Sequence, residues 1–257
     1  MLPVIFRADD VGISLSTVLA AKLAIERGVC RNVSVQAVGP HLALVRELLV
    51  PLQRAGRIDL GLHVTLNCEW DFPRFRPIGR HPHLGLLDVD GAFVQHPGIL
   101  HERQLPGQAV VDEAEAQLAL LRAHGIEPDY VDEHMCFGWV PSLAGALSGF
   151  CVRHGLIQAD RIRFERPNPV RQADAVAQAL AGIAAAVHGP LCLAGHPVLP
   201  DHENGLFRMR GDTAYDLNGD RDAQRRMFTD PRIRALADSG RLQPVRYRDL
   251  AIGCSNC

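Results

Sequence analysis

The chain has 257 residues, of which 47% are hydrophobic and 22% are charged, and this composition is typical of a folded protein with a substantial core. A formal net charge of −2 argues against nucleic acid or an acidic membrane surface as a partner. No apolar run approaches the roughly 18 residues of a membrane span, and the first ten residues lack the features of a signal peptide, so we expect a cytoplasmic protein.

Segments with the periodicity of strands and of helices alternate along the chain. A strand is predicted at residues 3–8 and a helix at 15–28, where Ser14 or Ser16 can cap the first turn and Gly28 can end the last. The further predicted strands cover residues 32–38, 57–66, 128–134, 161–165, 190–195 and 241–250. The further predicted helices cover residues 41–56, 107–125, 141–155, 170–187 and 221–238.

This alternation of about seven strands with helices predicts an α/β fold of parallel βαβ units, open or closed into a barrel. We expect residues 1–257 to form a single domain, because no linker, repeat or low-complexity tract divides them. Two long segments, 67–107 and 197–220, are rich in proline, glycine and aromatic residues and break the alternation. Loops of this length in a compact domain are usually lids or binding loops.

Unusual polar residues fall at or just after the carboxyl ends of the predicted strands. They are Asp9, Asp10, His63, Asp132, His134, Arg163 and His196. In a βα barrel these strand ends share one face, which is where active sites are assembled. A single histidine in such a place is more often a hydrogen-bonded core residue than a ligand, so the prediction rests on the set as a whole.

Taken together, the set fits a catalytic metal site. One carboxylate and two neutral imidazoles from separate strands can bind a metal ion and leave positions open for water and substrate. Asp9 and Asp10 are adjacent at a strand end, so we expect them to point to opposite sides and to do different jobs. One would bind the metal, and the other would take a proton from a water that attacks a carbonyl. His196 could protonate the leaving group, and Arg163 could orient a carboxylate or stabilise negative charge.

Four motifs in chain order resemble a known family. "RADDVG" and "GLHVTL" look like the NADDFG and GLHLNL signatures of the YdjC-like carbohydrate deacetylases, also called the chitooligosaccharide deacetylase family. "PDYVDEH" is similar to the D-x-H strand end of that family, and "LAGHP" to its late HPG element. The resemblance covers nearly the whole chain. It implies a distorted, polysaccharide-deacetylase-like (β/α) barrel and the metal-dependent removal of an acetyl group from an N-acetylated sugar.

The resemblance also implies roles for individual residues. The metal ligands would be Asp10, His63 and His134. Asp9 would be the general base, and His196 matches the later histidine, with a role as acid. Asp132 would orient a histidine or take part in the acid–base network.

This chain departs from the family pattern in two places. Met135, Cys136 and Gly138 stand where members often have further histidines, which changes the pocket and hence the substrate. Arg7 replaces the usual asparagine, and its charge favours an acidic partner, either Asp9 or an anionic substrate. The aromatic residues of segment 67–107 could stack on a sugar or could instead pin the loop to the barrel. The candidate substrate-binding residues are Arg7, Trp70, Phe72 and Met135.

We therefore expect one divalent metal ion as cofactor. Zinc is favoured by the ligand chemistry, while magnesium, manganese, iron, cobalt and nickel remain alternatives. The expected partner is a small N-acetylated sugar rather than nucleic acid or a membrane, and a homodimer is possible. Three alternatives stay open: a hydrolase of another amide or ester, a sugar-binding protein without turnover, and Asp–His pairs that serve only as structural struts.

Overall fold

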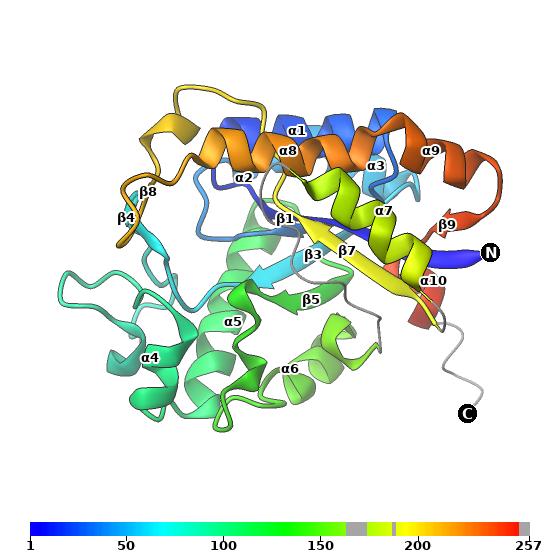
Figure 1. The fold of residues 1–257 in the computed structure, drawn as a ribbon. Coiled ribbons are helices and arrows are strands. Elements are labelled where there is room, and N and C mark those ends of the chain that lie inside the picture. The colour runs from blue at the N-terminus through cyan, green and yellow to red at the C-terminus, as the bar shows by residue number, and fades with distance from the viewer. Residues whose placement is uncertain (163–173, 187–188, 252–257) are drawn as a thin grey trace.

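The computed structural model describes residues 1–162, 174–186 and 189–251, and its centre is a curled sheet of seven parallel strands (Figure 1). Six strands follow the order β6–β5–β3–β2–β1–β7, and β9 pairs with the first residues of β1. The strands are β1 (Leu2–Val11), β2 (Asn32–Val35), β3 (Asp59–Val64), β5 (Tyr130–Glu133), β6 (Ile157–Gln158), β7 (Leu191–Gly195) and β9 (Leu242–Pro244). Eight consecutive residues of β1, from Val4 to Val11, are buried, as expected for a parallel strand with both faces covered.

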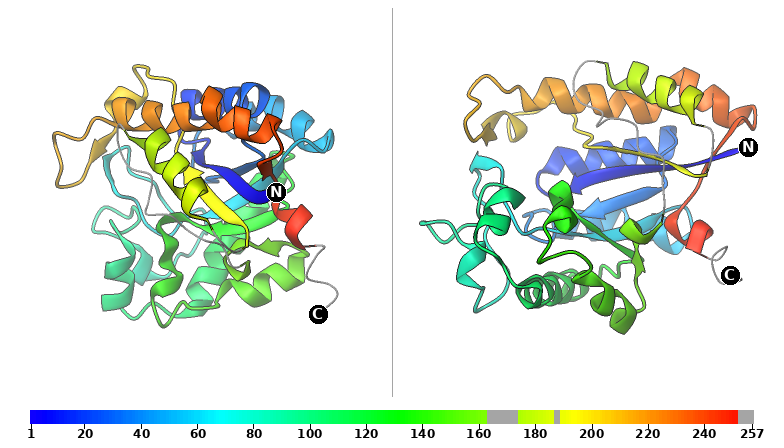
Figure 2. Two further views of the ribbon diagram at one scale, coloured as in Figure 1. Left: turned by 45° about the vertical axis from the view of Figure 1, so that its right-hand side comes forward. Right: turned by 60° about the horizontal axis from the view of Figure 1, so that its bottom comes forward.

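Helices surround the curled sheet. They are α1 (Leu15–Arg27), α2 (Leu42–Leu48), α3 (Val50–Arg54), α4 (Pro97–Glu102), α5 (Gly107–Ala123), α6 (Leu147–His154), α7 (Ala175–Ala185), α8 (Leu217–Thr229), α9 (Pro231–Asp238) and α10 (Tyr247–Ala251). Apolar residues of α1 and α5 share one core cluster with residues on the same face of β1, β3 and β5. Helices α1, α7, α8 and α9 lie on one side, and α5 and α6 lie on the other (Figures 1 and 2). None of the described helices is long and apolar enough to cross a membrane.

The predicted α/β class and the number of parallel strands are confirmed, but the sheet is not a closed barrel within the described residues. Its two ends are β6 and β7, and no described strand joins them. Of the strand predicted at 161–165, Arg161 instead ends a short 3-10 turn, and the residues from 163 onward lie outside the described part of the chain. The strand that follows β5 is instead β6, which the sequence analysis did not predict.

Prolines divide two of the predicted helices. The segment 41–56 forms α2 and α3, with Pro51 in the first turn of the second helix. The segment 221–238 belongs to α8 and α9, which are separated at Asp230, immediately before Pro231. A proline inside a helix removes a hydrogen bond and its ring clashes with the preceding turn, so each helix restarts there.

The two long loops meet at the carboxyl ends of the strands. The loop after β3 contains β4 (Trp70–Phe72), the loop after β7 contains β8 (Arg208–Met209), and these two short strands pair in antiparallel fashion (Figure 1). Arg210 strengthens this contact, because its guanidinium donates to Asp71 at 2.7 Å and to Asp88 at 2.8 Å. The loops therefore form one wall beside the strand ends that carry the candidate site.

Candidate metal centre

Three buried side chains, Asp10, His63 and His134, converge at the carboxyl ends of β1, β3 and β5. Asp10 Oδ1 lies 3.5 Å from His63 Nε2 and 3.2 Å from His134 Nδ1, and the two imidazole nitrogens are 3.3 Å apart. Ligand atoms bound at about 2.1 Å to one ion lie about 3.0 to 3.4 Å from one another, depending on the coordination geometry. The donor types and their spacing thus fit a divalent metal ion, which these residues could hold.

A bulge at the end of β1 brings both aspartates to this site. The pairing of β1 with β2 shifts register between Ala8 and Val11, and Asp10 has a φ of 58°. Aspartate is one of the few residues that tolerate this left-handed conformation, and a bulge breaks the alternation of side chains along a strand. Asp9 lies within 4.8 Å of His63 through its own ligand atom. The expectation that the two carboxylates point to opposite sides is therefore wrong.

The second oxygen of Asp10 is held by an arginine from α8. Arg221 Nη2 donates to Asp10 Oδ2 at 2.7 Å, and its guanidinium lies 5.3 Å from the centre of the Trp70 ring. Burial raises the pKa of Asp10, but Arg221, His196 and His134 lower it more, so that the pKa lies well below its usual value. Asp10 is therefore an anion with Oδ2 anchored and Oδ1 directed at the two histidines.

Asp9 is held in the same way by Arg7. Two guanidinium nitrogens of Arg7 donate to the two carboxylate oxygens of Asp9, at 2.6 and 2.7 Å. The third, Nη1, donates to the Tyr247 hydroxyl at 2.9 Å and lies 3.2 Å from Asp132. Burial lowers the pKa of Arg7, and Asp132 and Asp9 raise it, with a net rise well above the usual value. Of the two partners predicted for Arg7, the structure shows Asp9.

His63 is oriented by a carboxylate behind it. His63 Nδ1 and Asp132 Oδ2 are 2.8 Å apart, which fits a tautomer that donates from Nδ1 to Asp132 and turns Nε2 toward Asp10. Burial lowers the pKa of His63, whereas Asp132 raises it, and the net pKa is well above the usual value. The predicted contact of Asp132 with a histidine is thus present, and such a carboxylate fixes the orientation of the imidazole ring.

His134 makes a similar pair with a residue of the long loop. Its Nε2 lies 3.0 Å from Glu69 Oε2, which leaves Nδ1 directed at Asp10 and His63. Burial lowers the pKa of His134, but Glu69 and Asp10 raise it, with a net result of about 9. Without a metal ion, His134 is thus held as a cation between two carboxylates.

His196 lies at the open side of the cluster. Its side chain is 38% exposed, and Nε2 is 3.9 Å from Asp10 Oδ2. Gln224 Oε1 accepts from the backbone amide of His196 at 2.8 Å and lies 3.0 Å from Nδ1. An Nδ1–H donated to Gln224 leaves Nε2 facing the site. The other predicted rim residue, Arg163, lies outside the described residues.

The candidate substrate-binding residues of the loops differ in exposure. Trp70 is only 1% exposed and packs edge-to-face on Phe207 at 5.2 Å, beneath Arg221, so it is a packing residue and not the expected sugar-stacking surface. Phe72 and Met135 are 55% and 43% exposed. Phe72 belongs to β4 and Met135 directly follows β5, and their part in substrate binding stays a prediction.

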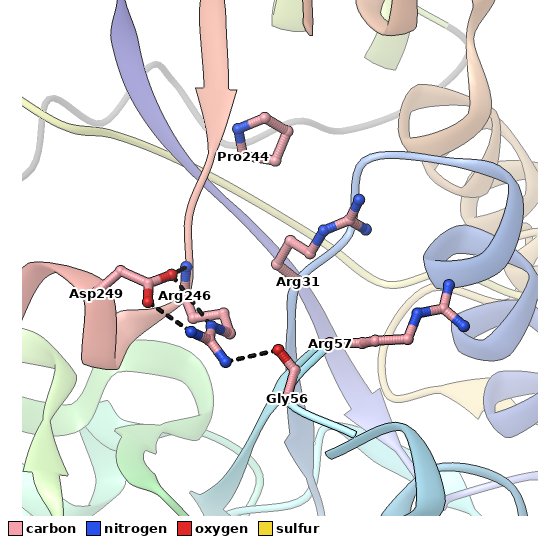
Figure 3. A pocket seen from close by; sticks show the side chains of 6 residues that line it. All are labelled: Arg31, Gly56, Arg57, Pro244, Arg246 and Asp249. Atoms are coloured by element: carbon pink, nitrogen blue, oxygen red, sulfur yellow. Dashed lines mark hydrogen bonds and ion pairs between the residues drawn. The ribbon is translucent and has the colours of Figure 1, made fainter. Parts of the chain in front are cut away.

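A surface pocket of about 270 Å³ lies at the opposite, amino-terminal ends of β2 and β3 (Figure 3). Its lining residues are Arg31, Gly56, Arg57, Pro244, Arg246 and Asp249. Arg246 is held there by Asp249 and by the carbonyl oxygen of Gly56. None of the lining residues belongs to the Asp–His cluster, so this pocket is separate from the candidate metal centre.

The family model for YdjC-like protein matches residues 3–239. The chain belongs to the YdjC-like family. A crystal structure of a candidate cellobiose-phosphate cleavage protein from Enterococcus faecalis V583 has the same fold, with a TM-score of 0.76, 19% identity, and coverage of 97% of this chain and 98% of that one. A family 4 carbohydrate esterase from Streptomyces lividans, in complex with acetate, aligns at a TM-score of 0.49 and 12% identity over 93% and 89% of the two chains, which is too weak to support an inference. A search of the curated proteins found no match.

Four side chains of this YdjC-like site were not predicted from the sequence. They are Gln36, Glu69, Arg221 and Gln224. Gln36 could have been predicted from the sequence, because it is a polar residue between apolar neighbours near the end of a predicted strand, as His63 is. The other three lie in a loop and on α8, where polar residues are common, so only the folded arrangement reveals their role.

Proposed function

We propose that this YdjC-like protein is a metal-dependent hydrolase that removes the acetyl group from an N-acetylated sugar. The observation that carries the proposal is the convergence of Asp10, His63 and His134, with the second carboxylate of Asp9 beside them. Asp9 and Asp10 both lie near His63, and each is paired with its own buried arginine. A purely structural hydrogen-bond network would not need two such carboxylates beside one histidine. A sugar-binding protein without turnover would not need Asp9, a second carboxylate beside the candidate ligands that can serve as a base.

Asp10, His63 and His134 would hold the ion, and two imidazoles with one carboxylate favour zinc over magnesium. A divalent ion held there would polarise the acetyl carbonyl and make hydroxide available near neutral pH. The protein's contribution is to fix the ligands. Arg221 holds one oxygen of Asp10, and Asp132 and Glu69 hold the outer nitrogens of the two histidines. These supporting contacts set the direction in which each ligand atom points.

Asp9 is the proposed general base. Its carboxylate is kept in one orientation by two hydrogen bonds from Arg7, so it is available to accept the proton of the attacking water. Arg7 thereby acts on Asp9 and not on the substrate. Arg7 itself is positioned by Tyr247 of α10.

His196 is the proposed acid. With Nδ1–H bonded to Gln224, a proton on Nε2 faces the site and can be donated to the departing amine. The exposure of His196 agrees with a place on the side from which substrate arrives. The proposed role of Arg163, orienting a carboxylate or stabilising negative charge, stays a prediction.

The first test measures metal and turnover together. The protein is purified without chelators, its metals are quantified by mass spectrometry, and the measurement is repeated with His63→Ala. His154→Ala is the matched control, because His154 pairs with Glu115 away from the cluster. We expect near-stoichiometric metal in the wild type and control and its loss in His63→Ala.

Turnover is then assayed on N-acetylated sugars, on acetyl esters, and on phosphorylated disaccharides, since the similar protein from E. faecalis is named for cellobiose-phosphate cleavage. We expect acetate release from an N-acetylated sugar that stops when the metal is removed. No bound metal after soaking with zinc, manganese or magnesium would contradict the proposal, as would acetate release that persists without metal.

A further inference from the structure

Gln36 is a buried amide that touches two of the three candidate ligands. It lies one residue beyond the end of β2 and is 1% exposed. Its Nε2 donates to Asp10 Oδ1 at 2.9 Å and lies 3.0 Å from His134 Nδ1. Its Oε1 is buried and has no hydrogen-bond partner among the described residues.

This arrangement leaves an amide oxygen unsatisfied in the core. Most buried side-chain oxygens in folded proteins are paired, and an unpaired one costs about 1 to 3 kcal/mol. Meanwhile the amide nitrogen contacts the same carboxylate oxygen and the same imidazole nitrogen that a metal ion would use. In the metal-free protein, an N–H group of Gln36 thus donates to Asp10 Oδ1 from the place where a cation would contact that oxygen.

A cation at the centre would reverse this preference. The partly positive NH₂ group would be repelled, whereas the amide oxygen would be attracted. Half a turn about the terminal side-chain bond exchanges the two atoms at small cost, because that bond has a broad, two-fold preference. The oxygen would then stand where Nε2 now stands, 2.9 Å from Asp10 Oδ1 and 3.0 Å from His134 Nδ1. That spacing matches ligands of one ion at right angles.

We infer that Gln36 is a fourth protein ligand of the metal ion, bound through its side-chain oxygen. This inference rests on the proposed metal site and deepens it. An amide ligand adds no charge, so Asp10 remains the anionic ligand of the set. An ion with four protein ligands keeps a place for water only if it accepts five or six ligands in all. The inference therefore favours an ion that expands beyond tetrahedral geometry, such as manganese, iron, cobalt or nickel, or zinc in a five-coordinate state.

The test measures metal affinity, not activity. Dissociation constants for zinc and manganese are determined by competition with a chromophoric chelator for the wild type, Gln36→Leu and Gln36→Glu. We expect Gln36→Leu to weaken binding by about 10- to 100-fold and Gln36→Glu, which offers a charged oxygen, to strengthen it. Gln117→Leu is the matched control, because this buried amide is paired with Thr65 and Glu113 outside the cluster.

A crystal structure of the metal-loaded wild type gives a second readout, which stands even if Gln36→Leu fails to fold. We expect Gln36 Oε1 within bonding distance of the ion. An unchanged affinity in folded Gln36→Leu would overturn the inference, and so would an amide that still donates to Asp10 beside the bound ion. Either result leaves the proposed function intact, whereas a wild type that binds no metal contradicts the proposed function itself.

Discussion

In the metal-free protein, the surroundings of His134 favour its charged form. Burial opposes the charge, but Glu69 at 3.0 Å and Asp10 at 3.2 Å outweigh burial and raise the pKa from 6.5 to about 9. A group whose pKa is higher in the folded state stabilises that state fully below the unfolded value. This stabilisation is lost as the pH rises through the folded value. We therefore predict that the metal-free protein becomes less stable between pH 6.5 and 9.

The size of the effect follows from the two pKa values. A tenfold difference in proton affinity is worth about 1.4 kcal/mol, so the full contribution of His134 is about 3 kcal/mol. Of this, about 2 kcal/mol disappears between pH 6.5 and pH 8.5. Glu133, whose pKa burial and Asp160 raise to about 8, changes stability in the same direction over part of this range. The contribution of His134 must therefore be isolated by a variant.

The assay is urea denaturation with EDTA at the two pH values, for the wild type and for His134→Gln. We expect the free energy of unfolding of the wild type to fall by about 2 kcal/mol more than that of the variant. Saturating zinc should reverse the trend in the wild type, because metal binds the neutral imidazole and competes with protons. An equal fall in both proteins without metal would refute the electrostatic account of His134.

Three further predictions concern single residues. Asp9→Asn should lower turnover by about 100-fold or more while metal content stays unchanged; full activity would exclude Asp9 as the base. Arg221→Leu should lower the free energy of unfolding by about 3 to 5 kcal/mol in denaturant titrations, because Asp10 would lose its buried partner, and a loss under 1 kcal/mol would contradict this. Trp70→Ala should cost a similar amount through lost packing, and a stable variant with only a raised KM would instead indicate substrate stacking.

The sequence predicted that Asp10, His63 and His134 lie close together, because the signal for this is local. Asp10, His63 and His134 each follow an apolar run, and parallel strands bring such ends to one edge. The bulge at Asp10 could not be predicted, because its residues read as an ordinary strand end. The periodicity of a loop sequence does not show which side chains are buried, so it left open whether Trp70 stacks on a sugar or packs against the protein, as the structure shows.

The supporting residues are harder to predict for a different reason. Glu69 and Arg221 reach the site from a loop and from α8, and their partners lie 65 and 211 positions away in the chain. A charged residue in such an element is usually solvated, and only packing of the whole sheet brings it against a histidine or an aspartate. Arg221 lowers the pKa of Asp10 and Glu69 raises the pKa of His134. The protonation states of these two groups therefore depend on the tertiary fold.

The pairing of β1 with three other strands, β2, β7 and β9, also has a consequence for how the protein is made. One edge of β1 pairs with β2, which follows soon in the chain. The other edge can pair only after residues 191–195 have been synthesised, and the first residues of β1 only after residues 242–244. Contacts between such distant segments form slowly, because long loops must close first. During synthesis, a chain that has emerged to residue 134 already carries Asp10, His63 and His134 but lacks the strands and the arginine that fix them. The positions of Asp10, His63 and His134 are thus fixed only after β7, Arg221 and β9 have been synthesised.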